Sequence, residues 1–405
     1  MAGFSCNNNR SSKYDKQLRS SLVLQDDYHQ DMPAKENQDV YYYILYSTDI
    51  QLGNPPQPFR AQVDIGWGDV FVPSWNCTYD SYEAQYCLPH NMYNSSQSSS
   101  YVADLSPARI HYMGIYTYGN VSQDSLYVGG AEINNQIFEE ATIWRPVPLF
   151  WDDLLDSALG LARLPLNFSD STIEARNPFQ NMIRQNLLDR NVFSLRLART
   201  DKEKGELLFG SVDNDRYTED LVRFPATNVT CGDNEAIAVY SSSGWQIPVQ
   251  SISLGSNSSS GPLHASLPNY TAILSTDFPH IGLPRGLAQQ FTKHCGAAVE
   301  LSALSCEERI LLPNLTVILG PDRHEIVLTP WDYMFEVEDK TYGTRCVLPF
   351  VDLMEMLDGF EYIILGTVFL SGLYSVFDYD NQIVSREFDL AFGFGFPYVR
   401  ARRLY

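Results

Sequence analysis

The sequence has little positive charge and no long apolar run. Lys and Arg together number 28, against 49 Asp and Glu, which gives a net charge of -21 over 405 residues. Such an acidic chain repels nucleic acid and anionic membrane surfaces, so these classes of partner are excluded. No apolar stretch reaches the length that crosses a bilayer, and we therefore expect no membrane span.

Metal-ligand patterns are also missing. The seven cysteines include no CxxC pair and no Cys/His cluster, so the sequence predicts neither a metal site nor a cofactor. Their spacing is typical of an oxidised protein, with Cys77 and Cys87 flanking a polar loop. The odd count leaves a thiol unpaired or bridged to another molecule, and Cys6 is the expected odd residue. The pairing of Cys6, Cys231 and Cys295 is left open.

No signal-peptide core follows Met1, because polar Asn and Ser residues come next. Sequons of the form Asn-x-Ser/Thr are instead abundant, where chance would give roughly three. They begin at Asn9, Asn76, Asn94, Asn120, Asn167, Asn228, Asn257, Asn269 and Asn314. This number predicts a secreted or secretory-pathway glycoprotein whose leader is absent from this chain. A cytosolic protein without any signal is the competing interpretation.

The chain changes texture near residue 39. Residues 1–38 are polar and irregular, which predicts an amino-terminal extension with at most one strand; whether it is a propeptide remnant is left open. After it, short runs rich in aromatic and β-branched residues alternate with Gly, Pro, Asn and Asp. These runs are 40–45, 59–63, 70–72, 194–197 and 207–209, and the best helical signals are 177–191 and 284–295. Many short strands with few helices predict an all-β architecture.

A faint repeat links the two halves of the chain. The segment 158–161, ALGL, is similar in character to 364–367, ILGT, and each follows an apolar strand by about 90 residues. Those two strands, 62–66 and 273–277, both end in a polar turn. The repeat predicts two similar lobes, although a match of this length is weak by itself.

The segment 61–74, AQVDIGWGDVFVPS, resembles the first active-site strand of the pepsin-like aspartic proteases (peptidase A1). Segments similar to other parts of that family follow in the correct order, and the resemblance covers roughly residues 40–395. They are 108–130 for the flap hairpin, 193–213, 244–247 at the start of the second lobe, and 362–384 for the closing strands. The resemblance implies two pseudo-symmetric β-barrel lobes, 39–215 and 216–405, with a cleft between them, in a monomer.

The same resemblance implies roles for individual residues. Asp64 matches the first catalytic aspartate, and Tyr112 matches the flap tyrosine. Cys306 and Cys346 match the usual disulfide of the second lobe. Family members normally have Asp-Thr-Gly-Ser at the first strand, whereas this chain has Asp-Ile-Gly-Trp from Asp64 to Trp67.

The second active-site strand departs from the family where the second aspartate should be. Residues 271–284, TAILSTDFPHIGLP, align with it, and Ser275, Thr276 and Asp277 occupy the Asp-Thr-Gly positions. Aspartic proteolysis uses two carboxyl groups that share one proton, and a serine hydroxyl does not ionise near acidic or neutral pH. The sequence therefore predicts a broken catalytic dyad, which usually costs several powers of ten in rate.

Further substitutions surround the expected cleft. Ile65 lacks the hydroxyl that normally braces the two loops, while Thr276 keeps its own. Trp67 replaces a small hydroxyl residue. Phe71 stands where the family usually has a tryptophan, and it has no indole N–H to contact the flap tyrosine. Met113 and Ile115 replace glycines of the flap and should make it stiffer. We expect a tighter and drier pocket. Its lining residues are Gly66, Trp67, Phe71, Met113, Thr276 and Phe278.

Several of these residues have more than one interpretation. Asp64 serves either as a single acid or base or only for local hydrogen bonding. Asp277 could replace the missing aspartate, but two residues along a strand displace a group by roughly 7 Å. Tyr112 is expected at the mouth of the cleft. His111 and His280 are expected to be incidental polar residues and not acid/base groups.

Non-proteolytic use of the cleft is therefore ranked ahead of proteolysis. A pseudo-protease would bind a peptide, a protein or a small apolar molecule between the lobes. A repurposed enzyme would use Asp64, with Ser275 or Tyr112, for proton transfer or cyclisation of a small apolar substrate. The alternative is a genuine acid endopeptidase that combines Asp64 with a displaced Asp277.

Overall fold

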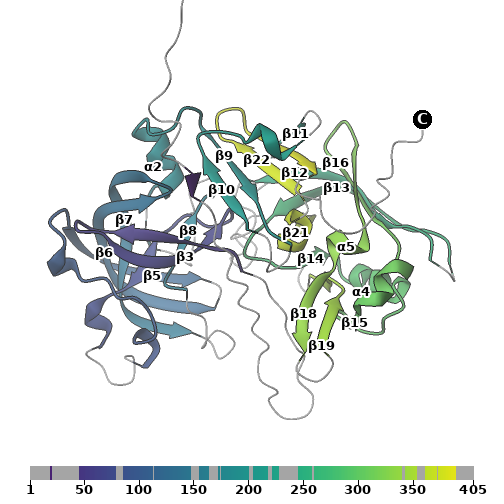
Figure 1. Ribbon diagram of the computed structural model, residues 1–405, viewed down its shortest axis with the longest axis horizontal. Coiled ribbons are helices and arrows are strands. Elements are labelled where there is room, and N and C mark those ends of the chain that lie inside the picture. The colour runs from purple at the N-terminus through teal and green to yellow at the C-terminus, as the bar shows by residue number, and fades with distance from the viewer. Residues whose placement is uncertain are drawn as a thin grey trace, which may run out of the picture.

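The computed structural model (Figure 1) describes most of the chain between residues 45 and 388, together with residues 19–20. The described ranges are 19–20, 45–78, 85–112, 114–146, 155–163, 172–173, 175–199, 204–217, 221–227, 245–257, 260–339, 343–353, 361–371 and 373–388. Some predictions lie outside these ranges, namely those for most of 1–38 and for Met113, Cys6, Cys231, Asn9, Asn167 and Asn228.

The amino-terminal lobe, on the left of Figure 1, is built on one seven-stranded sheet in the order β4-β7-β6-β2-β3-β8, with β5 paired to β6. Its strands are β2 (Ser47–Leu52), β3 (Gln57–Asp64), β4 (Phe71–Pro73), β5 (Val102–Tyr112), β6 (Ile115–Val128), β7 (Ala131–Pro146) and β8 (Ser157–Gly160). Residues 108–112 of β5 alternate between buried and more exposed side chains, as expected of a hairpin with one covered face. This hairpin of β5 and β6 is the predicted flap.

The carboxy-terminal lobe repeats this plan on the right of Figure 1. Its main sheet has the order β17-β16-β12-β13-β21-β14-β20, and a small sheet has the order β15-β19-β18. The main strands are β12 (Gln246–Leu254), β13 (Leu263–Leu274), β14 (Ile281–Leu283), β16 (Leu315–Leu319), β17 (His324–Leu328), β20 (Phe350–Asp352) and β21 (Tyr362–Leu365). The small sheet contains β15 (Ala303–Ser305), β18 (Phe335–Asp339) and β19 (Gly343–Val347).

A fourth sheet joins the lobes, with the order β1-β10-β9-β22-β23-β11. Its strands are β1 (Arg19–Ser20), β9 (Val192–Arg196), β10 (Glu206–Phe209), β11 (Val222–Pro225), β22 (Leu373–Asp378) and β23 (Ile383–Phe388). Trp245 packs edge-on against Phe193 and Phe377 of this sheet, and its indole N–H donates to the carbonyl of Leu161 at 3.0 Å. Aromatic packing and this hydrogen bond therefore fix the start of the second lobe against the first.

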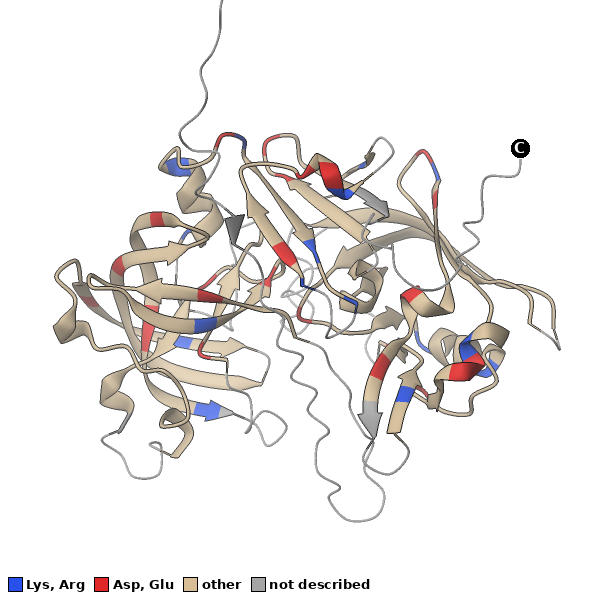
Figure 2. Ribbon diagram, viewed as in Figure 1, with Lys and Arg blue, Asp and Glu red and all other residues tan. Residues whose placement is uncertain are grey.

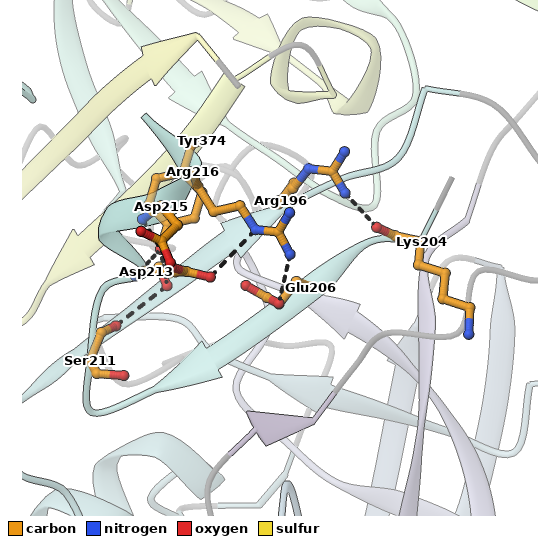
Figure 3. Close-up of polar contacts among 9 residues, drawn as sticks. Arg196, Lys204, Glu206, Ser211, Asp213, Asp215, Arg216 and Tyr374 are labelled. Carbon is orange, nitrogen blue, oxygen red and sulfur yellow. Dashed lines mark hydrogen bonds and ion pairs between the residues drawn. The ribbon is translucent and has the colours of Figure 1, made fainter. Parts of the chain in front are cut away.

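Polar contacts hold the 3-10 turn η4 (Asn214–Arg216) against this same sheet (Figure 3). Arg216 lies between Glu206, at 3.3 Å, and Asp213, at 3.5 Å. The backbone N–H of Asp213 donates to the hydroxyl of Tyr374 at 2.7 Å. Acidic residues are otherwise spread over both lobes (Figure 2), so the negative charge of the chain is not gathered in one part of the fold.

Helices are few and short within the described ranges. They are α2 (Pro178–Arg184), α4 (Leu287–His294), α5 (Pro330–Tyr333) and α6 (Thr367–Leu370), with 3-10 turns η1 (Trp75–Thr78), η2 (Ser95–Gln97), η4 (Asn214–Arg216) and η5 (Cys306–Leu311). Asn177 caps α2, because its side chain accepts the backbone N–H of Gln180 at 2.8 Å. Among the described residues no helix is long and apolar enough to cross a bilayer.

The predicted all-β bilobal fold is confirmed. The strand predictions at 59–63, 70–72, 194–197 and 207–209 each overlap a strand, and both predicted helices exist in shorter form. The repeat between the halves is structural as well: β8 runs parallel to β3 with Leu159 opposite Val63, and β21 runs parallel to β13 with Leu365 opposite Leu274. The division of the chain at residue 215 stays a prediction.

Candidate active site

Two loops meet where the repeat places them, directly after β3 and β13. A glycine lies beneath each loop, and a Cβ atom at Gly160 would come within 2.5 Å of the carbonyl oxygen of Trp67. At Gly366 a Cβ atom would come within 2.0 Å of the carbonyl oxygen of Phe278. Only glycine allows this close approach, which explains why the sequence repeat retains it. Trp67 and Phe278 thus occupy equivalent positions in the two loops.

Thr276 connects the two loops. Its hydroxyl donates to the carbonyl oxygen of Val63 at 2.8 Å and accepts the backbone N–H of Ile65 at 3.1 Å. Thr276 is fully buried, so both hydrogen bonds are protected from water. Ile65 has no hydroxyl to return the contact, and the brace between the lobes is therefore one-sided, as predicted from the sequence.

Asp64 lies at the bottom of the site with 1% of its surface exposed. Its Oδ1 accepts the backbone N–H of Gly66 at 2.6 Å, and its Oδ2 accepts the hydroxyl of Tyr112 at 2.9 Å. Burial raises the pKa of Asp64 well above its ordinary value, and the nearby charge of Asp277 raises it further. Hydrogen bonds from Gly66, Tyr112 and the N–H of Trp67 oppose this rise. Asp64 therefore retains its proton more strongly than an ordinary aspartic acid.

Ser275 and Asp277 form a hydrogen-bonded pair in the second loop. The hydroxyl of Ser275 donates to Oδ1 of Asp277 and accepts the backbone N–H of Phe278 at 2.9 Å. Burial raises the pKa of Asp277, whereas the Ser275 hydroxyl and the N–H groups of Asp277 and Phe278 oppose the rise. Ser275 is buried, with 1% exposed, and the side chain of Asp277 is half-buried.

The two carboxylates are held by equivalent backbone groups. Since Ser275 aligns with Asp64, the N–H groups of Gly66 and Trp67 correspond to those of Asp277 and Phe278. The first two act on Asp64, and the second two act on Asp277. A carboxylate therefore interacts with the N–H pair of the second loop even though the residue there is shifted along the chain.

The expected displacement of roughly 7 Å assumed strand spacing, and that assumption is wrong here. Strand β13 ends at Leu274, before the loop that contains Asp277. The chain turns after Leu274, so the side chain of Asp277 points back to Ser275 and its charge acts on Asp64. Spacing along a strand cannot describe a group that lies in a turn.

Aromatic rings enclose Asp64. The ring of Tyr112 lies 5.0 Å from that of Trp67 and 5.5 Å from that of Phe71, and all three side chains are buried. The indole nitrogen of Trp67 has no hydrogen-bond partner among the described residues. The tight, dry pocket expected from the sequence stays a prediction. Tyr112 lies deeper than the cleft mouth, because its hydroxyl bonds directly to Asp64.

The remaining predicted residues lie around this centre. Phe278 is half-buried and its ring lies 5.9 Å from that of His280, which is itself buried. His111 stacks on Tyr116 at 3.9 Å, on the face of β5 opposite to Tyr112. His111 therefore points away from Asp64, whereas His280 belongs to the same loop region as Asp277.

Sequence analysis missed another buried carboxyl group near the site, that of Glu139 in β7. It pairs in register with Phe71, and its Oε2 accepts the hydroxyl of Thr117 at 2.6 Å. Its Oε1 has no hydrogen-bond partner among the described residues. Burial, aided by the charge of Asp69, raises the pKa of Glu139 to about 8, against the effect of Thr117. The only signal in the sequence was a pair of glutamates, Glu139 and Glu140, between the apolar pairs 137–138 and 143–144.

The predicted disulfides Cys77–Cys87 and Cys306–Cys346 are both present. Cys306, Glu336 and Cys346 lie close enough to hold a metal ion, but the two sulfur atoms are bonded to each other and cannot act as thiolates. Cys295 is a buried free thiol.

The sequons of the described ranges differ in exposure. Asn76, Asn269 and Asn314 are exposed, whereas Asn94, Asn120 and Asn257 are half-buried. Glycosylation at these residues stays a prediction.

The chain is similar to known proteins over most of its length. A family model described as "Eukaryotic aspartyl protease" matches residues 45–386. The chain is 32% identical to vacuolar protease A of Aspergillus fumigatus over 351 residues, which cover 85% of this chain and 79% of that protein. It is 31% identical to cathepsin D of Dictyostelium discoideum over 360 residues, with 87% and 84% covered. Cathepsin D of Gallus gallus is also 31% identical over 358 residues, with 87% and 82% covered.

Proposed function

The chain belongs to the eukaryotic aspartyl protease family, and on that premise we propose that it cleaves peptide bonds at acid pH with Asp64 and Asp277 as its carboxyl pair. One observation carries the proposal: the hydroxyl of Thr276, the neighbour of Asp277, bonds to Val63 and Ile65 on either side of Asp64, so the two carboxyl-bearing loops meet in one site. The charge of Asp277 there raises the pKa of Asp64. That interaction is what a proton-sharing pair requires. The proposal reverses the ranking from the sequence, in which Ser275 placed non-proteolytic use of the cleft ahead of proteolysis.

The two carboxyl groups share one proton. Burial raises the pKa of both, while the Tyr112 hydroxyl at Asp64 and the Ser275 hydroxyl at Asp277 oppose the rise. The protonated group of the pair protonates the substrate, and the ionised group activates the attacking water. The substrate is a peptide bound between the lobes, and the flap carrying Tyr112 must lift from Asp64 to admit it.

The relatives and the buried carboxyl groups indicate the cellular compartment in which the proposed activity takes place. Proteins named vacuolar protease A and cathepsin D are similar over most of this chain. Both disulfides and the sequons fit a glycoprotein of the secretory route. Because the buried carboxyl groups of Asp64 and Glu139 have raised pKa values, the folded protein loses stability as the pH rises above the acid range, so an acidic compartment suits this fold.

A second candidate is the non-proteolytic use of the cleft. The hydroxyl of Tyr112 donates to Oδ2 of Asp64, and the rings of Trp67 and Phe71 pack against the ring of Tyr112. This aromatic surrounding favours a site for an apolar group. In that case a peptide, a protein or a small apolar molecule binds between the lobes. Asp64 is then a single acid or base, and Asp277 has only a local structural role.

Proteolysis at acid pH separates the two candidates. We expect purified protein to digest denatured haemoglobin or casein between about pH 3 and 5 and to be blocked by a statine-type inhibitor. Asp64→Asn and Asp277→Asn should each lower kcat/KM by about 100-fold or more. Asp322→Asn, which removes one exposed carboxylate, is the matched control and should keep full activity.

Two results would contradict the carboxyl pair. Full activity of Asp277→Asn, together with loss in Asp64→Asn, would leave a single catalytic carboxylate. Folded wild-type protein that digests nothing, but binds a peptide or an apolar compound equally well with and without Asp64→Asn, would support the binding function.

A further inference from the structure

Gln62 is a buried polar side chain whose amide makes no hydrogen bond to the described part of the chain. It lies in β3, two residues before Asp64, and none of its surface is exposed. Its amide oxygen Oε1 and its amide nitrogen Nε2 both lack a partner among the described residues. An unpaired buried amide is unfavourable for the fold, so this side chain calls for an explanation.

The strand register shows which way the amide of Gln62 faces. Side chains alternate along a strand, and Ala61 and Val63, on either side of Gln62, belong to the main hydrophobic core. Gln62 therefore lies on the other face of β3, together with Asp64. Its neighbour in the parallel strand β8 is Ala158, which belongs to a second, smaller core. The amide of Gln62 thus faces this smaller core.

The smaller core contains the aromatic rings that surround Asp64, namely those of Trp67, Phe71 and Tyr112. The indole nitrogen of Trp67, like the amide of Gln62, has no hydrogen-bond partner within the described ranges. The hydroxyl of Tyr112 must leave Asp64 when a peptide binds, and its ring then vacates space beside these polar groups. A substrate side chain next to the cleaved bond is in position to fill that space.

We propose that Gln62 determines specificity, because it selects substrates with a carboxamide side chain, Gln or Asn, beside the cleaved bond. The inference rests on the proposed function and names the substrate class of that same site. The nitrogen of Gln62 donates to the oxygen of the substrate amide, and the oxygen of Gln62 accepts an N–H of that amide. The indole N–H of Trp67 supplies a second donor for the same substrate oxygen.

An apolar substrate side chain fills the space but leaves the amide of Gln62 buried without partners. A site built to hydrogen-bond a substrate group rejects an analogue that lacks the group far more strongly than an apolar pocket rejects a change of one methylene. A substrate glutamic acid lies between these cases. Its protonated form presents a carbonyl and an O–H as an amide presents a carbonyl and an N–H, whereas its ionised form has acceptors only.

The test uses peptides that differ only in the residue on the amino side or on the carboxyl side of the cleaved bond. Two peptides compete for wild-type protein in one reaction, so the ratio of their cleavage rates gives the ratio of their kcat/KM values. We expect Gln to be favoured over Leu by about 10-fold or more at one of the two positions. The ratio of Glu to Gln should fall as the pH rises through about 4.3, the ordinary pKa of glutamic acid, whereas the ratio of Gln to Leu should stay constant.

A single substitution should reverse this preference. Gln62→Leu replaces the amide by an apolar side chain of similar size, so the variant should still cleave peptides but favour Leu over Gln by about 10-fold. It should also unfold at a higher temperature than the parent, because an unpaired buried amide has been removed. Gln289→Leu, at an exposed position of α4, is the matched control and should keep the wild-type preference.

The outcomes separate this inference from the function on which it rests. Wild-type protein that cleaves peptides but does not favour Gln over Leu at either position would overturn the specificity and leave the carboxyl pair in place. An unchanged preference in Gln62→Leu, or a lower unfolding temperature, would also contradict the role of Gln62. Folded protein that cleaves no peptide would overturn the proposed function, and its relative affinity for the Gln and Leu peptides, followed by tryptophan fluorescence, would then decide the inference.

Discussion

Glu139 should make the stability of this protein depend strongly on pH. The carboxyl group is fully buried, receives one hydroxyl from Thr117, and lies near the charge of Asp69. Its pKa rises from an ordinary value of 4.5 to about 8. Between these two pH values the folded protein therefore still binds the proton of Glu139, whereas the unfolded chain has lost it.

The sign and size follow from proton linkage. Below pH 4.5 both states are protonated, and Glu139 carries no penalty. Between pH 4.5 and about 8 the unfolded chain is ionised while the folded protein must stay neutral, so stability falls as pH rises. Each pH unit of this interval costs about 1.4 kcal/mol. The total loss by pH 8 is about 4–5 kcal/mol, a large part of an ordinary folding free energy.

Glu139→Gln removes this titration and keeps the shape of the side chain. We expect the variant and its parent to unfold alike at pH 4, and the variant to be more stable by about 3–5 kcal/mol at pH 8. Urea unfolding followed by tryptophan fluorescence measures the difference. An Asp64→Asn background prevents self-digestion and removes another raised carboxyl pKa. Glu325→Gln, at an exposed site, is the matched control.

Two results would refute the reasoning on Glu139. One is a difference in unfolding free energy between variant and parent that stays constant from pH 4 to 8. A residue that does not titrate in this range cannot make that difference change with pH. The other is a variant that is less stable at pH 8, which would mean that the ionised carboxylate has a favourable partner in the folded protein.

Three further predictions concern the site and its frame. Tyr112→Phe removes a hydrogen bond that lowers the pKa of Asp64, so the pH-activity profile should move to higher pH; a move to lower pH would contradict this. Thr276→Val leaves two buried backbone groups of the opposite loop unpaired and should lower the unfolding free energy by about 2–4 kcal/mol in urea titrations, whereas Thr276→Ser should not. Replacement of both Cys306 and Cys346 by serine removes a disulfide that spans a sequence separation of 40 and should cost about 4 kcal/mol in the same titration without reductant, with the Cys77–Cys87 disulfide intact; an unchanged unfolding free energy would contradict this.

Most of the fold was accessible from local sequence. Short β-rich runs predicted strands such as β3 and β10, and the repeated Gly160 and Gly366 predicted two lobes. The strand signals are local because β-propensity acts within a few residues, and the two glycines are visible as a repeated sequence although they contact loops far away in the chain. Helix lengths were overestimated, since α2 ends at Arg184, well before the predicted limit at residue 191.

The candidate site was accessible only in part. The sequence identified Asp64, Tyr112 and Thr276, because each lies in a stretch that resembles the family, and the structure brings them to one place. For Asp277 it assumed strand spacing, whereas β13 ends at Leu274, and the replacement of the missing aspartate by Asp277 stays a prediction. It missed Glu139, because a glutamate in a strand of mixed polar and apolar residues does not reveal whether its side chain is buried.

The sequence by itself determined the two-lobed β architecture, the cysteine pairs and the identity of the groups that surround the cleft. The pattern of apolar residues, glycines and cysteines specifies these features at short range. Only the tertiary structure decided which groups act on one another, such as Asp277 on Asp64 and Thr276 on the opposite loop. Electrostatic and hydrogen-bonding energies depend on distance and burial in space, and residues more than 200 positions apart, as in the contact between Thr276 and Val63, have no such relation until the chain folds.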